Sequence, residues 1–129
     1  MIALDTNVVV RLLVGDHPHQ TAVAQSCVAA GAFLSLGVLM EAEWVMRTTY
    51  RFSRERIADG FADLFDLECV QVEESELLRW GIERYRAGAD WSDLLHLIAA
   101  RAHAAFATFD RALPRHAGKD APVAIEVLK

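Results

Sequence analysis

The first eleven residues, MIALDTNVVVR (Met1–Arg11), contain the pattern that decides the fold. An apolar run, Ile2–Leu4, ends at the carboxylate of Asp5; two small polar residues follow, and a second apolar run begins at Val8. This pattern is typical of a buried strand that delivers an acid to the edge of a sheet, with a helix starting directly behind it. The alternative interpretation is that Asp5 only caps that helix.

The composition is that of one ordinary globular domain. The chain has 129 residues, of which 53% are hydrophobic and 24% charged, and this length is sufficient to bury a core. No apolar run approaches the ~20 residues of a membrane helix, and Asp5 interrupts the first one, so we expect a cytoplasmic protein without a membrane span or signal peptide. Cys27 and Cys69 have no metal-binding spacing, and we expect reduced thiols.

The net charge of −5 argues against a general nucleic-acid binder, because such proteins are usually basic. It does not argue against an enzyme that meets nucleic acid through metal ions. Eleven of the thirteen basic residues are Arg. Arg suits bidentate contact with phosphate, whereas genome composition would explain the same bias, and both interpretations stay open.

Short apolar runs alternate with helical stretches along the whole chain. The predicted strands are Ile2–Leu4, Phe33–Ser35, Glu68–Val72 and Phe106–Thr108, with Val123–Val127 as a fifth, edge strand. The predicted helices are Asn7–Val14, Pro18–Ala30, Gly37–Tyr50, Ser53–Asp66, Glu73–Ala87 and Trp91–Ala104, with a short helix or turn at Arg111–His116. Strands separated by helices predict an α/β fold, with a central parallel sheet of four to five strands and helices on both faces.

Four acids fall at strand ends or helix starts of this arrangement, namely Asp5, Glu41, Asp93 and Asp110. Parallel α/β sheets bind ligands outside the carboxyl ends of their strands, so the four can converge on one edge. Carboxylates packed together repel one another, and a divalent cation removes that cost. Ligands that offer only oxygen suit Mg²⁺ or Mn²⁺, and the expected chemistry is hydrolysis of a phosphate ester.

Each acid also has a purely structural interpretation. Asp93 and Asp90 could simply cap their helix, and Asp110 could be a turn residue. Glu41 competes with Glu43, because the two lie about 200° apart on a helix and cannot both face one site. Both flank the apolar stripe of their helix, so periodicity does not choose between them.

Four segments carry a resemblance to a known family. They are LDTNVVVRLL (4–13), VLMEAEWVMR (38–47), ADWSDLLH (89–96) and TFDR (108–111). With these segments in this order, the chain resembles PIN-domain nucleases of the VapC toxin type, from bacterial toxin–antitoxin pairs. Trp91 and Ser92 depart slightly from the commoner Phe-Ala of that family.

The resemblance implies a three-layer PIN-like fold in a single domain, residues 1–129. It implies a Mg²⁺- or Mn²⁺-dependent endoribonuclease that hydrolyses RNA phosphodiester bonds with a metal-activated water. Its implied partners are the RNA substrate, a small antitoxin that inserts a segment into the acidic groove, and a second copy of the chain in a homodimer. The alternatives are a PIN-domain nuclease outside a toxin–antitoxin system and a metal-binding interaction domain without nuclease activity.

The resemblance also assigns roles to residues. It selects Glu41 over Glu43. The implied catalytic and metal-ligating residues are Asp5, Glu41, Asp93 and Asp110, and the implied supporting residues are Thr6, Asn7 and Thr108.

Aromatic and histidine side chains near these motifs receive a plainer interpretation. Trp44, Trp80, Phe61 and Phe65 fall at helical spacing, and we expect them in the core or a dimer interface rather than as base-stacking platforms. His96 shares a helix face with Asp93, three residues earlier, and we expect a packing or surface role for it.

Overall fold

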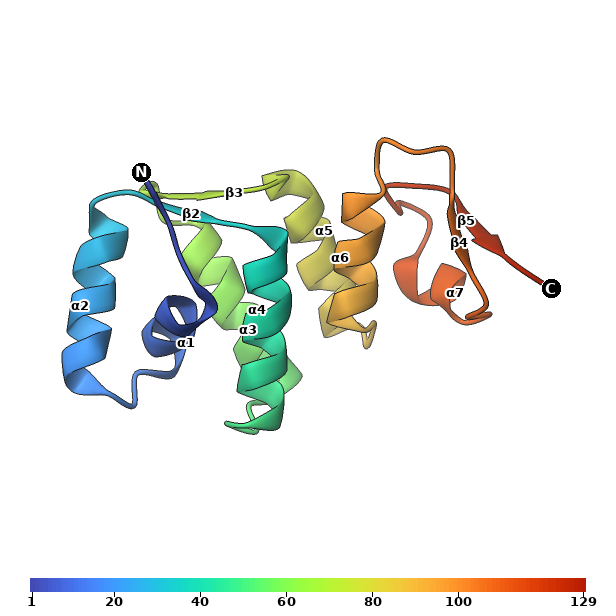
Figure 1. Cartoon of the computed structure of the whole chain (residues 1–129). Helices are drawn as coiled ribbons and strands as arrows, with labels where there is room; N and C mark the ends of the chain where they lie inside the picture. The colour runs from blue at the N-terminus through green and yellow to red at the C-terminus, as the bar shows by residue number, and fades with distance from the viewer. The chain divides into compact units, whose positions relative to one another are not determined.

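The computed structural model describes all residues from 1 to 129, which form two compact units, Met1–Ser75 (unit 1) and Glu76–Lys129 (unit 2). Unit 1 contains β1 (Ile2–Ala3), α1 (Thr6–Val14), α2 (Pro18–Ala29), β2 (Ala32–Leu34), α3 (Leu36–Thr48), α4 (Arg54–Phe65) and β3 (Val70–Val72) (Figure 1). Unit 2 contains α5 (Ser75–Arg86, which starts one residue earlier), α6 (Trp91–Ala99), β4 (Phe106–Thr108), α7 (Leu113–Ala117) and β5 (Ile125–Val127).

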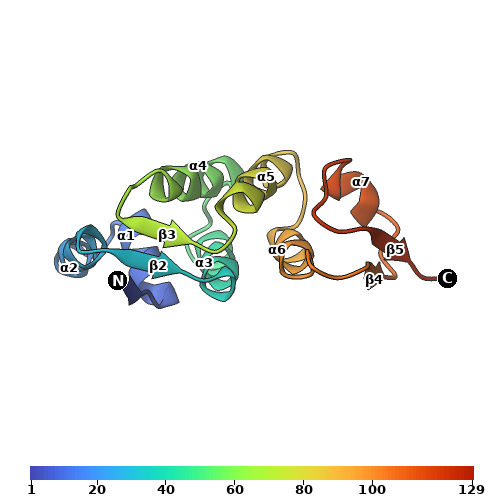
Figure 2. The ribbon, with the colours of Figure 1, turned by 90° about the horizontal axis from the view of Figure 1, so that it is seen from above.

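The sheet of unit 1 has three parallel strands in the order β1-β2-β3, and Figure 2 shows it from its open side. Ile2 pairs with Ala32, and Phe33 pairs with Gln71. Parallel neighbours need a crossover, and α1 with α2 provides the first while α3 with α4 provides the second. Both crossovers step in the same direction across the sheet. Because such connections are right-handed, all four helices lie on one side of this sheet (Figure 1).

The core of unit 1 lies between that sheet and its helices. On β2, Ala32 and Leu34 are buried while Phe33 between them is partly exposed, as the alternation of side chains along a strand requires. Helix α1 packs against both α2 and α3. Phe61 and Phe65 of α4 are buried, with stacked rings whose centroids are 6.0 Å apart, so the prediction that they belong to the core is confirmed.

Unit 2 pairs β4 with β5 in parallel, with Phe106 opposite Ile125. Helices α5 and α6 meet through a close approach at Gly81 and an edge-on contact between the rings of Tyr85 and Trp91, whose centroids are 5.4 Å apart. A second apolar cluster joins α6, α7 and the segment before β5. Its buried members are Leu97, Leu113, Ala117 and Val123.

The α7 helix is held by a side chain from α5. The Arg84 guanidinium donates from Nε to the carbonyl of His116 (2.8 Å) and from Nη2 to the carbonyl of Arg115 (3.3 Å). These two carbonyls belong to the last turn of α7, where no intrahelical partner exists. Arg84 therefore fixes the end of a helix that is only five residues long.

All five expected strands are present and every strand pairing is parallel, and the pairings divide them into sheets of three and two strands. One expected boundary is wrong by several residues. Helix α6 ends at Ala99 rather than Ala104, because residues 100–105 form turns and most of them are exposed, so a longer helix would bury little.

Smaller differences arise where polar side chains serve other purposes. β3 starts at Val70 rather than Glu68, and α5 starts at Ser75 rather than Glu73. Glu73 instead accepts a hydrogen bond from the backbone N–H of Leu36 at the start of α3 (3.2 Å). Both cysteines are free, as expected. None of the helices combines the length and the apolar character needed to cross a membrane.

We expect Gly118→Ala to destabilise the protein by about 1–2 kcal/mol, because Gly118 has φ of +77°. In addition, an added Cβ would lie only 3.1 Å from Cζ of Arg84, the side chain that fixes α7. Gly37→Ala is the matched control, since no atom lies within 4 Å of its added Cβ and its φ is ordinary. The midpoint of urea unfolding measures the stability of both variants. Equal midpoints would contradict the inference that the contact of Gly118 with Arg84 fixes the end of α7.

Candidate functional site

Asp5 follows β1 and caps α1. Its Oδ1 accepts a hydrogen bond from the backbone N–H of Thr6 (2.8 Å). The capping interpretation is therefore correct, but it uses one carboxylate oxygen, and the exposed side chain leaves Oδ2 without a hydrogen bond. Thr6 is buried and Asn7 is exposed beside it. A capping acid with one free oxygen is held in place while remaining able to bind a ligand.

The structure separates Glu41 from Glu43. Glu43 is only 4% exposed, and its Oε2 lies 2.7 Å from Nε of Arg47, one turn further along α3. Glu41 is exposed and makes no ion pair. Helix α3 starts at the carboxyl end of β2, the strand beside β1, so it begins at the same sheet edge as Asp5. Glu41 is thus the glutamate of this helix that is free to take a ligand.

In unit 2, Asp93 lies among other acids at the start of α6. Burial raises the pKa of the Asp93 carboxyl, and the neighbouring charges of Asp90 and Asp110 raise it further. His96 and His116 act in the opposite direction and lower it. Asp90 caps α6 by accepting from the backbone N–H of Asp93 (3.0 Å), so the capping interpretation holds for Asp90. The side chain of Asp93 is not used as a cap.

Asp110 is held in a tight turn after β4. Its backbone N–H donates to Oγ1 of Thr108 (3.0 Å), and its Oδ1 accepts from the backbone N–H of Ala112 (2.8 Å). The turn interpretation is correct, and it again leaves the second carboxylate oxygen free. Thr108 contacts the backbone of Asp110 rather than its carboxylate. The structure thus brings Asp93 and Asp110 close enough to repel, although seventeen positions separate them in sequence.

His116 was not selected from the sequence. It lies on α7, its charge acts on Asp93, and its backbone carbonyl is the one that Arg84 holds. No periodicity or local motif links these three residues, because they come from three different helices. Only the packing of unit 2 reveals the relation.

Neither unit by itself gathers three or more Asp, Glu, His or Cys side chains closely enough to hold a metal ion. Unit 1 carries Asp5 and Glu41, and unit 2 carries Asp93 and Asp110. The chemistry of this donor set fits a hard divalent cation, because the donors are carboxylate oxygens and Asp93 is already repelled by its acidic neighbours. The convergence of all four acids stays a prediction.

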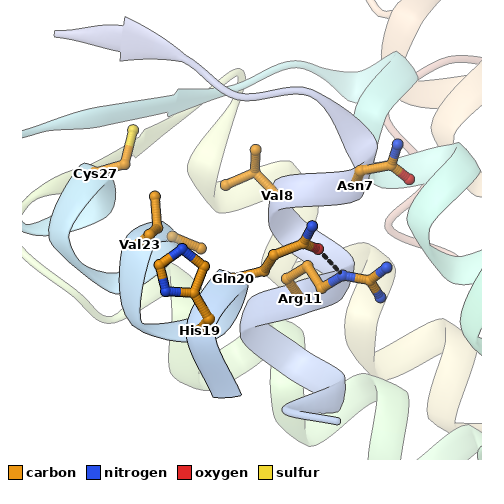
Figure 3. A pocket seen from close by; sticks show the side chains of 8 residues that line it. Asn7, Val8, Arg11, His19, Gln20, Val23 and Cys27 are labelled. Atoms are coloured by element: carbon orange, nitrogen blue, oxygen red, sulfur yellow. Dashed lines mark hydrogen bonds between the residues drawn. The ribbon is translucent and has the colours of Figure 1, made fainter. Parts of the chain in front are cut away.

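A cavity of about 400 Å³ lies between α1 and α2 (Figure 3). It contains no carboxylate, so it is separate from the predicted acid cluster. Arg11 at its rim donates to Oε1 of Gln20 and to the hydroxyl of Tyr50 (3.2 Å), and lies 3.6 Å from Asp16. Arg11 is therefore committed to contacts within unit 1. The lining residues are Asn7, Val8, Arg11, His19, Gln20, Val23, Ala24 and Cys27.

The parallel strands and crossover helices define an α/β protein. Its acids at strand ends and helix starts are suited to a divalent cation. The model of the PIN domain family matches residues 2–119, and the chain belongs to this family. The predicted α/β fold class is thereby confirmed, and membership of the family implies the PIN-like three-layer α/β/α fold. PIN domains are generally metal-dependent nucleases, so the chain has a nuclease fold. Searches of curated proteins and of solved structures found no match.

We expect Asp93→Asn to stabilise the metal-free protein at neutral pH. The pKa of Asp93 is raised in the folded state, so the unfolded chain releases this proton at lower pH than the folded chain does. The ionised side chain therefore lowers stability above the folded-state pKa, and this penalty vanishes below the ordinary carboxyl pKa of 3.8. The thermal midpoint in EDTA, followed as pH falls, should show the advantage of the variant shrinking.

Asp63→Asn, on the exposed side of α4, controls for the removal of one surface carboxylate. An Asp93→Asn midpoint equal to or below that of the wild type at neutral pH would contradict the repulsive acid cluster.

Proposed function

We propose that this PIN-domain protein is a Mg²⁺- or Mn²⁺-dependent endoribonuclease that acts as the toxin of a toxin–antitoxin pair. The observation that carries the proposal is the group of acids in unit 2, where burial and the charges of Asp90 and Asp110 raise the pKa of Asp93 and the turn after β4 fixes Asp110 through one carboxylate oxygen. A fold that keeps carboxylates together against their repulsion has a use for a cation. Membership of the PIN domain family supports the nuclease activity.

We assign the binding of the cation to Asp5, Glu41, Asp93 and Asp110. When bound, a divalent cation supplies polarisation of the phosphoryl oxygens and a water of lowered pKa. The protein's own contribution is to fix the ligands before substrate arrives. The N–H of Thr6 orients Asp5 through one oxygen, and the Thr108 hydroxyl holds the backbone of Asp110. Fixed carboxylates lose little conformational freedom on binding a ligand, which favours tight and geometrically selective binding.

The negative charge of the chain and of its acid positions supports the choice of partners. The chain carries a net charge of −5, and its acid positions favour a basic side chain from a protein partner. This supports a small antitoxin that inserts a basic segment and thereby competes with the cation. We also propose a homodimer in the cytoplasm, as the family resemblance implies, with RNA as the substrate.

We expect Asp5→Asn and Glu41→Gln to slow RNA cleavage by about 100-fold or more, because loss of a metal-binding oxygen weakens both cation binding and its placement. The assay follows a labelled RNA with Mg²⁺, with Mn²⁺ and with EDTA. Asp63→Asn is the matched control, since it removes an exposed acid of unit 1 outside the site. Both variants should unfold at the wild-type temperature in EDTA, since neither side chain is buried and an asparagine amide oxygen can still accept from the N–H of Thr6.

RNA cleavage by Asp5→Asn at the wild-type rate would contradict the assignment of Asp5 to the cation-binding site. A wild-type protein that binds Mn²⁺ in a calorimetric titration but cleaves no RNA would favour a metal-binding interaction domain. The toxin role is tested separately by the neighbouring reading frame. A short frame encoding a DNA-binding N-terminus and a basic C-terminus, whose product inhibits cleavage, is the expected result.

A further inference from the structure

The first turn of α3 is fixed by two side chains, one of which comes from a distant part of the chain. Ser35, the residue before α3, accepts a hydrogen bond from the backbone N–H of Val38 with Oγ (3.2 Å). Glu73 accepts from the backbone N–H of Leu36 with Oε1 (3.2 Å), although 37 positions separate the two residues. The helix dipole also favours a carboxylate at a helix N-terminus. The start of α3 is therefore tied to the end of β3 as well as to its own sequence.

Glu73 lies at the carboxyl edge of the sheet of unit 1, where β2 and β3 run side by side (Figure 2). Leu34 pairs with Val72, and these are the last residues of β2 and β3. Ser35 and Glu73 therefore follow the two strands at the same level. The register between β1 and β2, continued past the last pair of β1, places Asp5 opposite Ser35. Three neighbouring strands thus deliver Asp5, Ser35 and Glu73 to one level of the sheet edge.

Apolar packing holds the later turns of α3 rather than the first. The first buried residue is Leu39, and Ala42 and Met46 continue the same buried side. Residues 36–38, which form the first turn, are exposed or only partly buried. Trp44, which was expected in the core or a dimer interface, is 57% exposed, so its core assignment is wrong and its indole adds little to this packing. The position of the first turn therefore depends on its two hydrogen-bonded caps.

The chain turns away from the sheet edge directly after Glu73. Glu74 has a φ of +52°, in the left-handed region that is unfavourable for a residue with a side chain. Helix α5 begins at the next residue, Ser75. A strained backbone of this kind persists only where the surrounding structure determines it. The hydrogen bond between Glu73 and the N–H of Leu36 is one contact that does so.

We propose that Glu73 is a positioning residue, which holds the first turn of α3 and thereby sets the place of Glu41 relative to Asp5. This inference rests on the proposed function, in which both of these acids bind the cation. Glu41 lies five residues after Leu36 on the same helix, so a shift of the first turn moves its carboxylate. Two strand spacings, about 10 Å, separate the backbones at Glu73 and Asp5, which suits a role through α3 rather than as a ligand of the same ion.

The test is a calorimetric titration of the full chain with Mn²⁺ in the absence of RNA. We expect Glu73→Ala to weaken Mn²⁺ binding about tenfold, because Glu41 is then no longer held in place. Glu73→Gln should bind Mn²⁺ nearly as the wild type does, since its amide oxygen can still accept from the N–H of Leu36. Glu68→Ala is the matched control, because Glu68 is an exposed acid that precedes the same strand, at its amino end.

A second control separates positioning from a general loss of stability. Ser53 caps α4 by accepting from the backbone N–H of Arg56 (3.1 Å), and α4 carries none of the proposed ligands. Ser53→Ala should lower the thermal midpoint about as much as Glu73→Ala does, since each variant removes one helix cap. Ser53→Ala should nevertheless leave the Mn²⁺ affinity unchanged.

Hydrogen exchange of the Leu36 amide, followed by NMR in EDTA, tests the contact itself. We expect this amide to exchange about tenfold faster in Glu73→Ala than in the wild type, because its acceptor is lost. Glu73→Gln should retain the protection. In RNA cleavage assays, Glu73→Ala should raise the Mg²⁺ concentration needed for the half-maximal rate about tenfold, while KM for RNA at saturating Mg²⁺ changes little.

Failure of this inference is distinguishable from failure of the proposed function. Wild-type Mn²⁺ affinity for Glu73→Ala, with weakened binding by Asp5→Asn, would overturn the positioning role and leave the cation site in place. Equal losses of Mn²⁺ affinity in Glu73→Ala and Ser53→Ala would also overturn it, because destabilisation would then explain both. So would equal losses in Glu73→Ala and Glu73→Gln, because the charge rather than the hydrogen bond would then be needed. Wild-type Mn²⁺ affinity for both Asp5→Asn and Glu41→Gln would instead contradict the proposed function.

Discussion

Parallel pairing of very short strands is the constraint on which the rest of this structure depends. The strands of unit 1 have only two or three residues, and each parallel neighbour has to be reached through a crossover that starts at the same edge of the sheet. Helix N-termini therefore gather at that edge, and their orphan N–H groups require acceptors. Asp5 and Ser35 meet this need for α1 and α3. Polar residues are placed there by the demands of the backbone, before any chemistry is considered.

An acid that accepts a backbone N–H with one carboxylate oxygen can bind a cation with the other. Asp5 and Asp110 each give one oxygen to a backbone N–H, and these bonds fix the carboxylates at no cost to the second oxygen. Asp93 differs, because its neighbour Asp90 takes the capping role and leaves the Asp93 side chain half-buried and repelled. The interpretations of these acids as structural and as functional are thus compatible rather than exclusive. Removal of the capping oxygen would disturb the helix and the site together.

Local pattern predicted the parts of this structure that depend on neighbours in sequence. The strand ending at Asp5 and the acid after Phe106–Thr108 were both visible, because an apolar run that stops at an acid is a local signal. The local sequence pattern did not predict contacts between segments that lie far apart in the chain. The burial of Glu43 with Arg47 separates it from Glu41 only once α3 is packed. The exposure of Trp44 is equally invisible in a helical pattern that places it beside apolar residues.

Because the Arg84 side chain of α5 holds the last turn of α7, the ordering of α7 depends on the folding of α5. A helix of five residues is too short to persist in water on its own. Its last-turn carbonyls are occupied by the guanidinium of α5, and its apolar side chains pack against α6. We therefore expect α7 to open to solvent together with α5 and α6, as one cooperative folding unit. Local melting of α5 would release the end of α7 without any change near α7 in sequence.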